Sequence, residues 1–440
     1  MNVLLLARIQ FGLTIGFHFL FPPISIGLAW WVVTLEALAR RRRDPAWEGL
    51  ARYFGRLFTL TFGAGVATGV VMSFQFGTTW SGFVTVVSDI FGSFLVAEVF
   101  FSFFVESVFL GIWLFGRDRA PAWLHRLSMV VVAAAATFSG FWILAANSWM
   151  QTPAGYAIVD GQIRLVHFAA ALFNPSTFEH VLHTINASLL TGSFLVAGSS
   201  AYLLLKGRPG AGIRQLLAAA VISCLVFAVV EAVPSGHLLT VEVGRRQPAK
   251  LATIEGVYET TDRAPFLLFG VPTPDPPYVK NRVEIPGALS FLFEFDSDYT
   301  VTGLEDIPVD ERPPFAVTFI SFHLMVYLGI LLIVIAGVAV LLLLLRRLHS
   351  ARWMLRVLAA VIPLPLVCLQ LGWITAEVGR QPWVVYGLLR TRDAVSPSVT
   401  GGELVFSLAA FGMVYLAVGV AYVVLMARTI RQGPDAGGAY

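Results

Sequence analysis

The sequence predicts an all-α integral membrane protein with about nine transmembrane helices. Of its 440 residues, 57% are apolar and only 13% are charged, and the mean hydropathy is +0.76. So little charge cannot cover the surface of a soluble protein. About nine segments also reach the ~20 apolar residues that a helix needs to cross the hydrocarbon core. The net charge of +3 is too small to indicate nucleic-acid binding.

The predicted spans are joined by short connections, with one exception. They cover about nine ranges, each with a run of ~20 apolar residues: 10–37, 56–80, 93–115, 127–149, 181–205, 214–238, 318–345, 354–377 and 403–427. The exception is a long polar segment rich in proline, residues 241–317. We therefore expect residues 1–240 to hold six helices, residues 241–317 to form a functional loop, and residues 318–440 to hold three helices. The first span is too long for a signal peptide and is expected to be retained.

Basic residues gather in alternate connections, which predicts the orientation. Examples are Arg40 to Arg43 after the first span, Arg117 and Arg119 after the third, and Arg428 and Arg431 after the ninth. Cytoplasmic loops carry an excess of Lys and Arg. The N-terminus is therefore expected outside and the C-terminus in the cytoplasm, so that residues 241–317 lie on the outer side.

The third span carries ionisable residues at a regular spacing. Glu98, Ser102 and Glu106 follow one another at four-residue steps, and Asp118 lies just beyond the span. A charged residue at mid-membrane costs ~2.5–3.5 kcal/mol on insertion scales, so it indicates a function. The order predicts a proton path from the cytoplasm toward the outer half of the protein. Carboxylates that merely hydrogen-bond between helices remain the alternative.

Four potential heme or metal ligands fall within the spans or at their ends. They are His18, His183, Met325 and Glu377, and the predicted orientation places all four toward the outer face. Neutral imidazole is the commonest side-chain ligand of metals, and His with Met is an axial pair of electron-transfer hemes. Four candidates in one layer favour ligation over packing.

The other histidines and both cysteines are expected to have ordinary roles. We expect the five other histidines considered to be solvated or interfacial: His125, His167, His180, His237 and His349. Cys224 and Cys368 are isolated within apolar runs, so they form neither a zinc site nor a disulfide framework and are expected to pack.

Two long motifs identify a resemblance. These are Gly372-Trp-Ile-Thr-Ala-Glu-Val-Gly-Arg-Gln-Pro-Trp383 and Lys250-Leu-Ala-Thr-Ile-Glu-Gly-Val-Tyr-Glu-Thr260. Together with the opening Arg8-Ile-Gln-Phe, His18 and the spacing of Glu98 and Glu106, they are similar to the motifs of cytochrome bd quinol oxidase subunit I. The resemblance covers nearly the whole chain. Residues 241–317 then correspond to the Q-loop of that family, in its short form.

The resemblance implies a bundle that binds three hemes. These are a low-spin heme b, a high-spin heme b, and either heme d or a third heme b at the O2 site. Carried over by position, His183 and Met325 would ligate the low-spin heme iron. His18 and Glu377 would each ligate one high-spin heme iron, in an order that the sequence does not assign.

Further site residues follow from the same resemblance. Trp373, Arg380 and Arg8 would lie close to the high-spin hemes, where Arg380 can hold a propionate. Lys250 and Glu255 would bind and deprotonate quinol. Without the surrounding motif, an ordinary surface charge pair would be the preferred interpretation of these two residues.

One departure from the family concerns the low-spin heme. His323 stands two residues before Met325, where many members have arginine. The two side chains lie about 200° apart on a helix, so they cannot face the same heme. His323 is therefore a second candidate near the low-spin heme.

The implied activity is that of a quinol:O2 oxidoreductase, with ubiquinol or menaquinol as donor. Quinol would be oxidised at the outer face and O2 reduced to water with protons from the cytoplasm, which generates proton motive force without a copper centre. The implied partners are cytochrome bd subunit II, small single-span subunits, quinol, O2 and the lipid of the bacterial cytoplasmic membrane.

A proton-coupled transporter is the alternative of a different class, because membrane carboxylates serve it equally well. It predicts an internal repeat with broken helices, and no convincing repeat is found. A heme–copper oxidase would need a histidine cluster, which the 8 scattered histidines do not supply.

Overall fold

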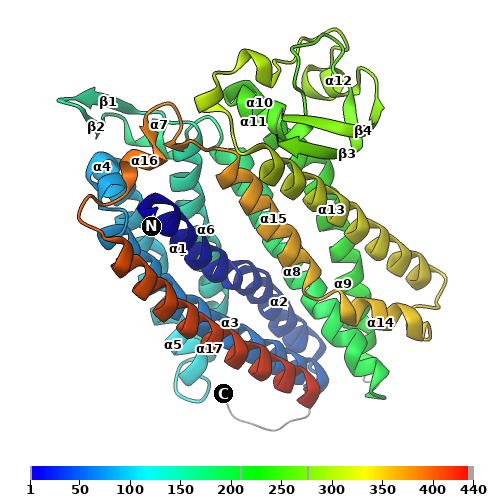
Figure 1. The fold of residues 1–440 in the computed structure, drawn as a ribbon. Helices are drawn as coiled ribbons and strands as arrows, with labels where there is room; N and C mark the ends of the chain where they lie inside the picture. The colour runs from blue at the N-terminus through cyan, green and yellow to red at the C-terminus, as the bar shows by residue number, and fades with distance from the viewer. Residues whose placement is uncertain (1, 209–210, 275–276, 435–440) are drawn as a thin grey trace.

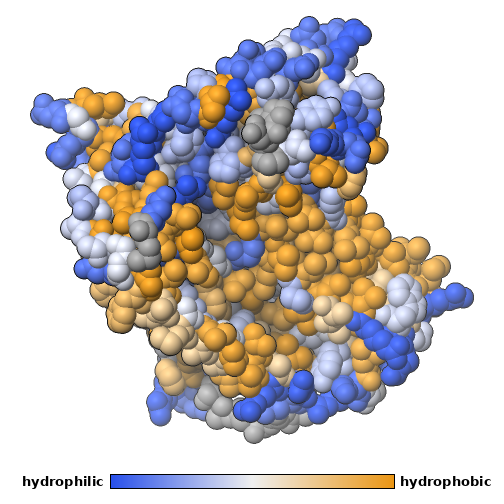
Figure 2. Space-filling view, viewed as in Figure 1, coloured by the Kyte–Doolittle hydropathy of each residue, from blue (hydrophilic) through white to orange (hydrophobic). Residues whose placement is uncertain are grey.

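The computed structural model describes residues 2–208, 211–274 and 277–434. Within this part of the chain, nine helical stretches are long and apolar enough to cross a membrane, which confirms the predicted fold class. Figure 2 shows a broad hydrophobic band between two hydrophilic ends of the molecule, as expected for a protein surrounded by lipid.

The nine stretches consist of long helices, several of them interrupted. Their parts are α1 (Val3–His18) with α2 (Phe21–Arg42), α3 (Pro45–Thr78), α4 (Ser81–Glu98) with the π-helix η1 (Val99–Phe103) and α5 (Phe104–Phe115), α6 (Ala122–Gln151), α8 (Thr177–Leu205), α9 (Ala211–Val230) with the π-helix η2 (Glu231–Ser235) and α10 (Gly236–Arg246), α13 (Phe315–Leu344), α14 (Arg352–Ala360) with α15 (Leu364–Val378), and α17 (Gly401–Gln432).

The helices form two halves (Figure 1). Helices α1 to α6 and α17 pack together in one half, and α8, α9, α13, α14 and α15 form the other, with α2 and α6 packed against α8 between them. In Figure 2 the face is hollowed between the halves, and hydrophilic residues line the upper part of the hollow.

Proline accounts for most of the interruptions within the spans. Pro22 and Pro23 stand at the start of α2, Pro234 lies inside η2, and Pro363 immediately precedes α15. Proline lacks the N–H that the helix ladder requires, so the helix must stop, restart or change its pitch there. The break before α2 leaves His18 as the last residue of α1.

Most helices extend beyond the predicted spans because their polar ends remain helical. The third span was expected from residue 93, but its helix begins at Ser81. The added turns contain Asp89, which is exposed and pairs with Arg164 at 3.4 Å. Similarly, α10 continues to Arg246, past residue 241, where the loop was expected to begin. Hydropathy detects the lipid-facing length of a helix and not its capped ends.

The segment between α10 and α13 is a folded unit, here called the loop domain (residues 247–314). Its elements are α11 (Pro248–Glu255), the antiparallel hairpin β3 (Phe266–Pro274) and β4 (Pro277–Ile285), α12 (Ala288–Glu294), and the 3₁₀ turns Leu304–Asp306 and Val309–Glu311. Leu251, Leu267 and Val279 belong to its apolar core, which also includes Phe319 of α13. The loop domain is therefore anchored on the helix bundle.

Smaller elements lie at the same end of the bundle (Figure 1). They are β1 (Tyr156–Val159) paired with β2 (Gln162–Leu165), α7 (Phe168–Leu172), β5 (Trp383–Val385) paired with β6 (Leu389–Arg390), and α16 (Thr391–Ala394). We call this end the loop end. The opposite end, where α2 closes with Arg40 to Arg42, is called the arginine end.

The two halves meet through a contact between glycines. A Cβ atom added to Gly27 of α2 would lie 2.7 Å from the Cα atom of Gly192 on α8. Small residues let membrane helices approach closely and gain van der Waals contact without help from the hydrophobic effect. Any larger side chain at either position must separate α2 from α8.

We expect the G27V substitution to lower the stability of the assembled protein by about 1–3 kcal/mol, because overpacking moves one helix away from the other. The measurement is the thermal unfolding midpoint in detergent. G63V is the matched control, since a Cβ atom added to Gly63 meets nothing within 4 Å in the described structure. Equal midpoints for the two variants would contradict the importance of this contact.

Candidate functional site

A buried ion pair lies where α15 ends at the loop end. Arg380 is only 3% exposed and donates to Glu377, whose Oε1 atom accepts a hydrogen bond from Asn147 Nδ2 of α6 at 2.9 Å. The Nε and Nη1 atoms of Arg380 have no hydrogen-bond partner among the described residues. Burial lowers the pKa of the Arg380 guanidinium, and the Glu377 charge opposes this. A buried guanidinium with free donors suits an anionic group such as a heme propionate.

His18 and Glu377 come from helices that contact each other. Phe19, directly after His18, stacks on Trp373 of α15 with ring centroids 5.0 Å apart. Gln370 of α15 donates to the Gly16 carbonyl oxygen at 2.9 Å. The structure therefore brings the two proposed ligands of the high-spin hemes to one interface.

The surroundings of His18 hold its ring by one nitrogen. Its Nδ1 atom lies 2.9 Å from Thr68 Oγ1, and Gly69 leaves room beside the ring, since a Cβ atom there would lie 3.2 Å from His18 Cε1. No described side chain hydrogen-bonds to Nε2. Trp373 has a buried Nε1 atom that likewise lacks a partner among the described residues. These features fit a ring that binds iron through Nε2.

His183 and Met325 line the other half of the bundle. His183 of α8 contacts η2, with Nδ1 3.1 Å from Glu231 Oε1. Met325 of α13 faces α15, where Cys368 Sγ donates to its carbonyl oxygen at 3.3 Å. The helix α8, which carries His183, and the helix α13, which carries Met325, both pack against α9. These helices belong to one packed group.

His323 points away from Met325. It is 7% exposed and stacks on Phe319, with ring centroids 4.0 Å apart, toward the loop domain. Its Nδ1 atom lies 3.0 Å from the Phe319 carbonyl oxygen. Met325 is therefore the residue of this pair that faces α15, since a Cβ atom added to Gly372 would lie 2.9 Å from its Sδ atom.

Lys250 and Glu255 on α11 are both buried, at 4% and 2% exposure, so the alternative of a surface charge pair is wrong. Lys250 Nζ donates to Gln151 Oε1 of α6 at 2.7 Å. Burial, with a contribution from the Arg380 charge, lowers the pKa of Lys250 to about 7. Burial raises the pKa of Glu255 to about 8. Five residues apart, the two side chains leave α11 about 140° from each other.

Gln151 connects this lysine to the Glu377 region. It also accepts two hydrogen bonds from Gln247 Nε2, each 2.9 Å long, and its own amide lies 3.5 Å from the Ala376 carbonyl oxygen. The Cγ atom of Lys250 packs on Gly379, 3.2 Å from where a Cβ atom would lie. The loop domain and the end of α15 thus form one polar site.

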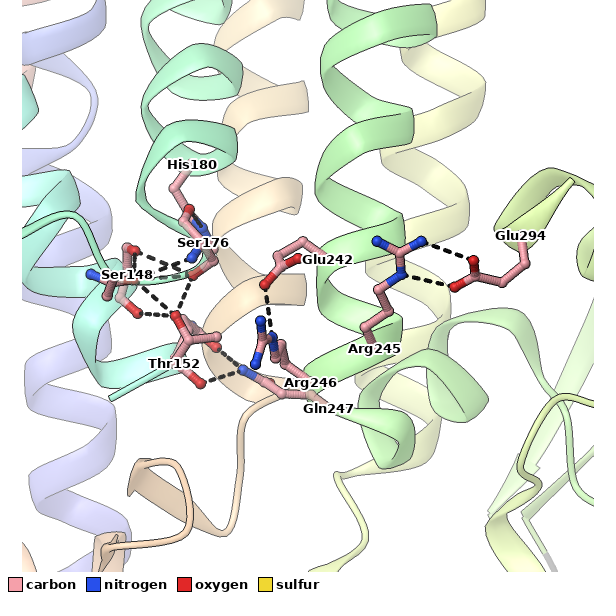
Figure 3. A network of polar contacts seen from close by, with 11 residues as sticks. Ser148, Thr152, Ser176, His180, Glu242, Arg245, Arg246, Gln247 and Glu294 are labelled. Carbon is pink, nitrogen blue, oxygen red and sulfur yellow. Dashed lines mark hydrogen bonds and ion pairs between the residues drawn. The ribbon is translucent and has the colours of Figure 1, made fainter. Parts of the chain in front are cut away.

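A wider network frames that site (Figure 3). Ser148 of α6 and Thr152, directly after α6, hydrogen-bond to Ser176 at the start of α8, and Arg245 of α10 pairs with Glu294 of α12 at 2.8 Å. His180 belongs to this network, since its Nδ1 atom lies 2.8 Å from the Ser176 carbonyl oxygen. The expectation of a solvated or interfacial His180 is wrong. The ring is 8% exposed because it folds back onto the first turn of α8.

The residues of the expected proton path differ in burial and in their helical setting. Ser102 and Glu106 are buried, at 0% and 6% exposure, and Glu98 accepts a hydrogen bond from Ser139 of α6 at 2.6 Å. The π-helix η1 lies between Glu98 and Glu106, so their spacing is not that of a regular α-helix. Asp118 is exposed in the turn after α5 at the arginine end.

Arg8 is a proposed site residue that the structure does not join to the others. It is exposed on α1, and no hydrogen bond or ion pair to it is found within the described part of the chain.

Two partly buried carboxylates were missed by the sequence analysis. Glu36 of α2 accepts a hydrogen bond from Trp113 Nε1 at 2.8 Å, and Glu231 lies beside His183. Both fall inside predicted spans. A charged residue within a span indicates a function, and this argument, applied above to Glu98 and Glu106, would also have identified them. Gln151 carries no such signal, since a neutral amide at a helix end is common.

The residues present fit hemes as bound groups. The donor set of imidazole, thioether and carboxylate matches known axial ligands of heme iron, and the unpartnered donors of Arg380 and Trp373 suit the heme edge.

Comparison with known proteins identifies the family. Residues 6–434 match the family described as cytochrome bd terminal oxidase subunit I. The chain is 37% identical to cytochrome bd ubiquinol oxidase subunit 1 of Bacillus subtilis (strain 168), over 99% of this chain and 95% of that protein. It is 30% identical to cytochrome bd-II ubiquinol oxidase subunit 1 of Escherichia coli (strain K12), over 99% and 98%.

A solved structure agrees with these sequence matches. The bd oxidase of Geobacillus thermodenitrificans superposes with a TM-score of 0.91 at 32% identity, over 98% of this chain and 99% of that one. The chain belongs to the family of cytochrome bd terminal oxidase subunit I.

Proposed function

We propose that this chain is the heme-bearing subunit of a quinol oxidase that oxidises quinol at the outer face and reduces O2 to water with cytoplasmic protons. The observation that carries the proposal is the single polar site in which Lys250, Gln151 and the Glu377–Arg380 pair meet at the loop end. A site that joins a buried lysine to a candidate heme ligand suits a donor that passes electrons to heme. The ubiquinol oxidase names of the B. subtilis and E. coli relatives support the same donor class.

The arginines support a cytoplasmic location for the arginine end. Arg40 to Arg42 close α2 there, and Arg431 lies in the last turn of α17. By the positive-inside rule the loop end then faces outward. Quinol protons released at the loop end would enter the outer compartment, so that turnover generates proton motive force across the bacterial cytoplasmic membrane.

The ligand assignments are carried over from the family resemblance. His183 and Met325 would hold a low-spin heme b, and His18 and Glu377 would each hold one of two high-spin hemes, of which one is heme d or a third heme b. The hemes, when bound, supply electron transfer and the reduction of O2. Arg380 would hold a propionate and keep Glu377 oriented, and Trp373 would pack beside it with Arg8 at the rim.

Lys250 and Glu255 have separate tasks in this proposal. Lys250, hydrogen-bonded to Gln151, would position a quinol oxygen, and Glu255 would accept a proton. Their different directions from α11 show that they do not form one ion pair.

Protons for water formation would enter from the arginine end. Asp118 at the surface, then the buried Glu106 and Ser102, and finally Glu98 with its Ser139 donor, provide the ordered polar groups. The π turn between Glu98 and Glu106 sets their relative direction.

Residues 241–317 would act as a short Q-loop between the helical regions 1–240 and 318–440. The alignment with the E. coli relative spans 504 positions and that with the B. subtilis relative 445, which supports an insertion in the former that this 440-residue chain lacks. Subunit II and small single-span subunits would be the partners in the membrane.

The E377A substitution should remove one high-spin heme signal, because it deletes a ligand and leaves Arg380 as an unpaired buried charge. The measurement is the reduced-minus-oxidised spectrum of the assembled oxidase. E284A on the exposed hairpin β4 is the control. A wild-type spectrum in E377A would rule out the ligand assignment.

The E106Q substitution should slow O2 consumption at least about tenfold, since the amide cannot relay a proton, while the heme spectrum stays unchanged. Steady-state O2 uptake and proton uptake in liposomes are the measurements. E48Q, on an exposed carboxylate at the arginine end, should behave as wild type. Normal turnover and proton uptake in E106Q would exclude this route.

The rate of quinol oxidation should rise with pH through about 8, because the pKa of Glu255 is raised to about 8 and only its ionised form accepts a proton. E255Q should lose this rise and reduce kcat/KM by about 10²-fold. E259Q, at an exposed position in the same segment, is the control. The pH profile of kcat/KM is the measurement, and an unchanged profile in E255Q would contradict its role as base.

A further inference from the structure

The sixth span changes its helical pitch beside His183. Its residues Glu231–Ser235 form the π-helix η2, which contains Pro234, and the Gly236 N–H donates to the Glu231 carbonyl oxygen. Proline has no N–H to offer the preceding turn, so the wider turn bridges the gap in the ladder. Short π segments of this kind often occur at functional sites.

This turn directs two side chains onto one ring nitrogen. Glu231 Oε1 lies 3.1 Å from His183 Nδ1, and Ser235 Oγ lies 3.2 Å from the same atom. In the described structure, no hydrogen bond reaches His183 Nε2. The ring is thus held by Nδ1 and keeps Nε2 for a ligand.

Glu231 is itself held in place. Asn186, one turn after His183 on α8, donates to Glu231 Oε2 at 2.6 Å and also to the Phe227 carbonyl oxygen at 2.9 Å. Ser235 Oγ lies 3.4 Å from the same Oε2 atom. The Glu231 side chain is only 18% exposed. Donors converging on both oxygens form the environment of a carboxylate rather than of a packing residue.

We propose that Glu231 is a positioning residue for the low-spin heme, fixing His183 with its proton on Nδ1 and lowering the reduction potential of the iron that Nε2 would bind. The inference rests on the assignment of His183 under the proposed function. Ligating histidines commonly donate their second N–H to a carboxylate or carbonyl, which sets the tautomer and raises the basicity of the ligand.

A carboxylate in this position would favour one oxidation state of the iron that His183 would bind. A carboxylate that accepts the Nδ1 proton gives the imidazole more anionic character, which stabilises ferric iron more than ferrous iron. A serine hydroxyl alone would not do so, because it carries no charge. A lower potential at the low-spin heme favours onward transfer of electrons to the high-spin hemes.

The test is a spectroelectrochemical titration of the assembled oxidase, following the low-spin heme band. In E231Q the band should remain, and the reduction equilibrium should shift about tenfold toward the reduced heme. For one electron this raises the midpoint potential by about 59 mV. E231D keeps the charge and should return the midpoint toward the wild-type value. S235A should not raise it.

E36Q is the matched control. It makes the same change in another hydrogen-bonded carboxylate within a span, one that contacts Trp113 and no proposed heme ligand. An upward shift in E231Q that is absent in E36Q supports the proposal. An unchanged midpoint in E231Q, or an equal shift in both variants, overturns it.

If E231Q loses the low-spin band, the E231D variant decides how that loss is interpreted. Recovery of the band in E231D supports a positioning carboxylate, and failure to recover it overturns the proposal. H183A separately tests the assignment on which the inference rests. A low-spin heme that persists in H183A refutes that ligand, whatever E231Q does.

Discussion

The buried guanidinium of Arg380 is the constraint on which the loop end of this protein depends. A positive charge at 3% exposure must be compensated, and Glu377 supplies the opposite charge from one turn earlier on the same chain segment. Asn147 holds the second oxygen of that carboxylate. Removing either member of the pair would leave an uncompensated charge in a low-dielectric environment. The α6 helix contacts this pair through Asn147, and α11 reaches the same region through the Lys250–Gln151 hydrogen bond.

Departures from regular helix geometry place side chains for which a role in the chemistry is proposed. His18 ends α1 because Pro22 and Pro23 require a new helix start, and Glu231 reaches His183 through a π turn at Pro234. A straight helix would point these residues elsewhere. The bilayer favours unbroken helices, since every backbone group must find a partner, so each interruption must be compensated by packing against a neighbouring helix.

Much of the architecture was predictable from sequence, because lipid imposes a length and a hydropathy on each span. The ends of the spans were less predictable, as Ser81 and Arg246 show, since polar residues continue a helix into water without any hydropathy signal. Burial of Lys250, Glu255 and His180 was beyond hydropathy as well. Gln151, the partner of Lys250, lies far away in the chain, and only the fold brings the two together. Ser176 is a near neighbour of His180 in the sequence, but nothing in the sequence shows that this ring bends back onto it and is buried.

The loop domain shares its apolar core with Phe319, which belongs to the same helix as Met325. Six residues of α-helix separate the two by about 9 Å along a rigid rod. A substrate bound against α11 is therefore held at a fixed position relative to α13, which a flexible loop would not provide. On the proposed assignment, the electron-transfer distance from bound quinol to the low-spin heme is therefore set by α13 and the core it shares with α11. It does not depend on the motion of the exposed strands β3 and β4.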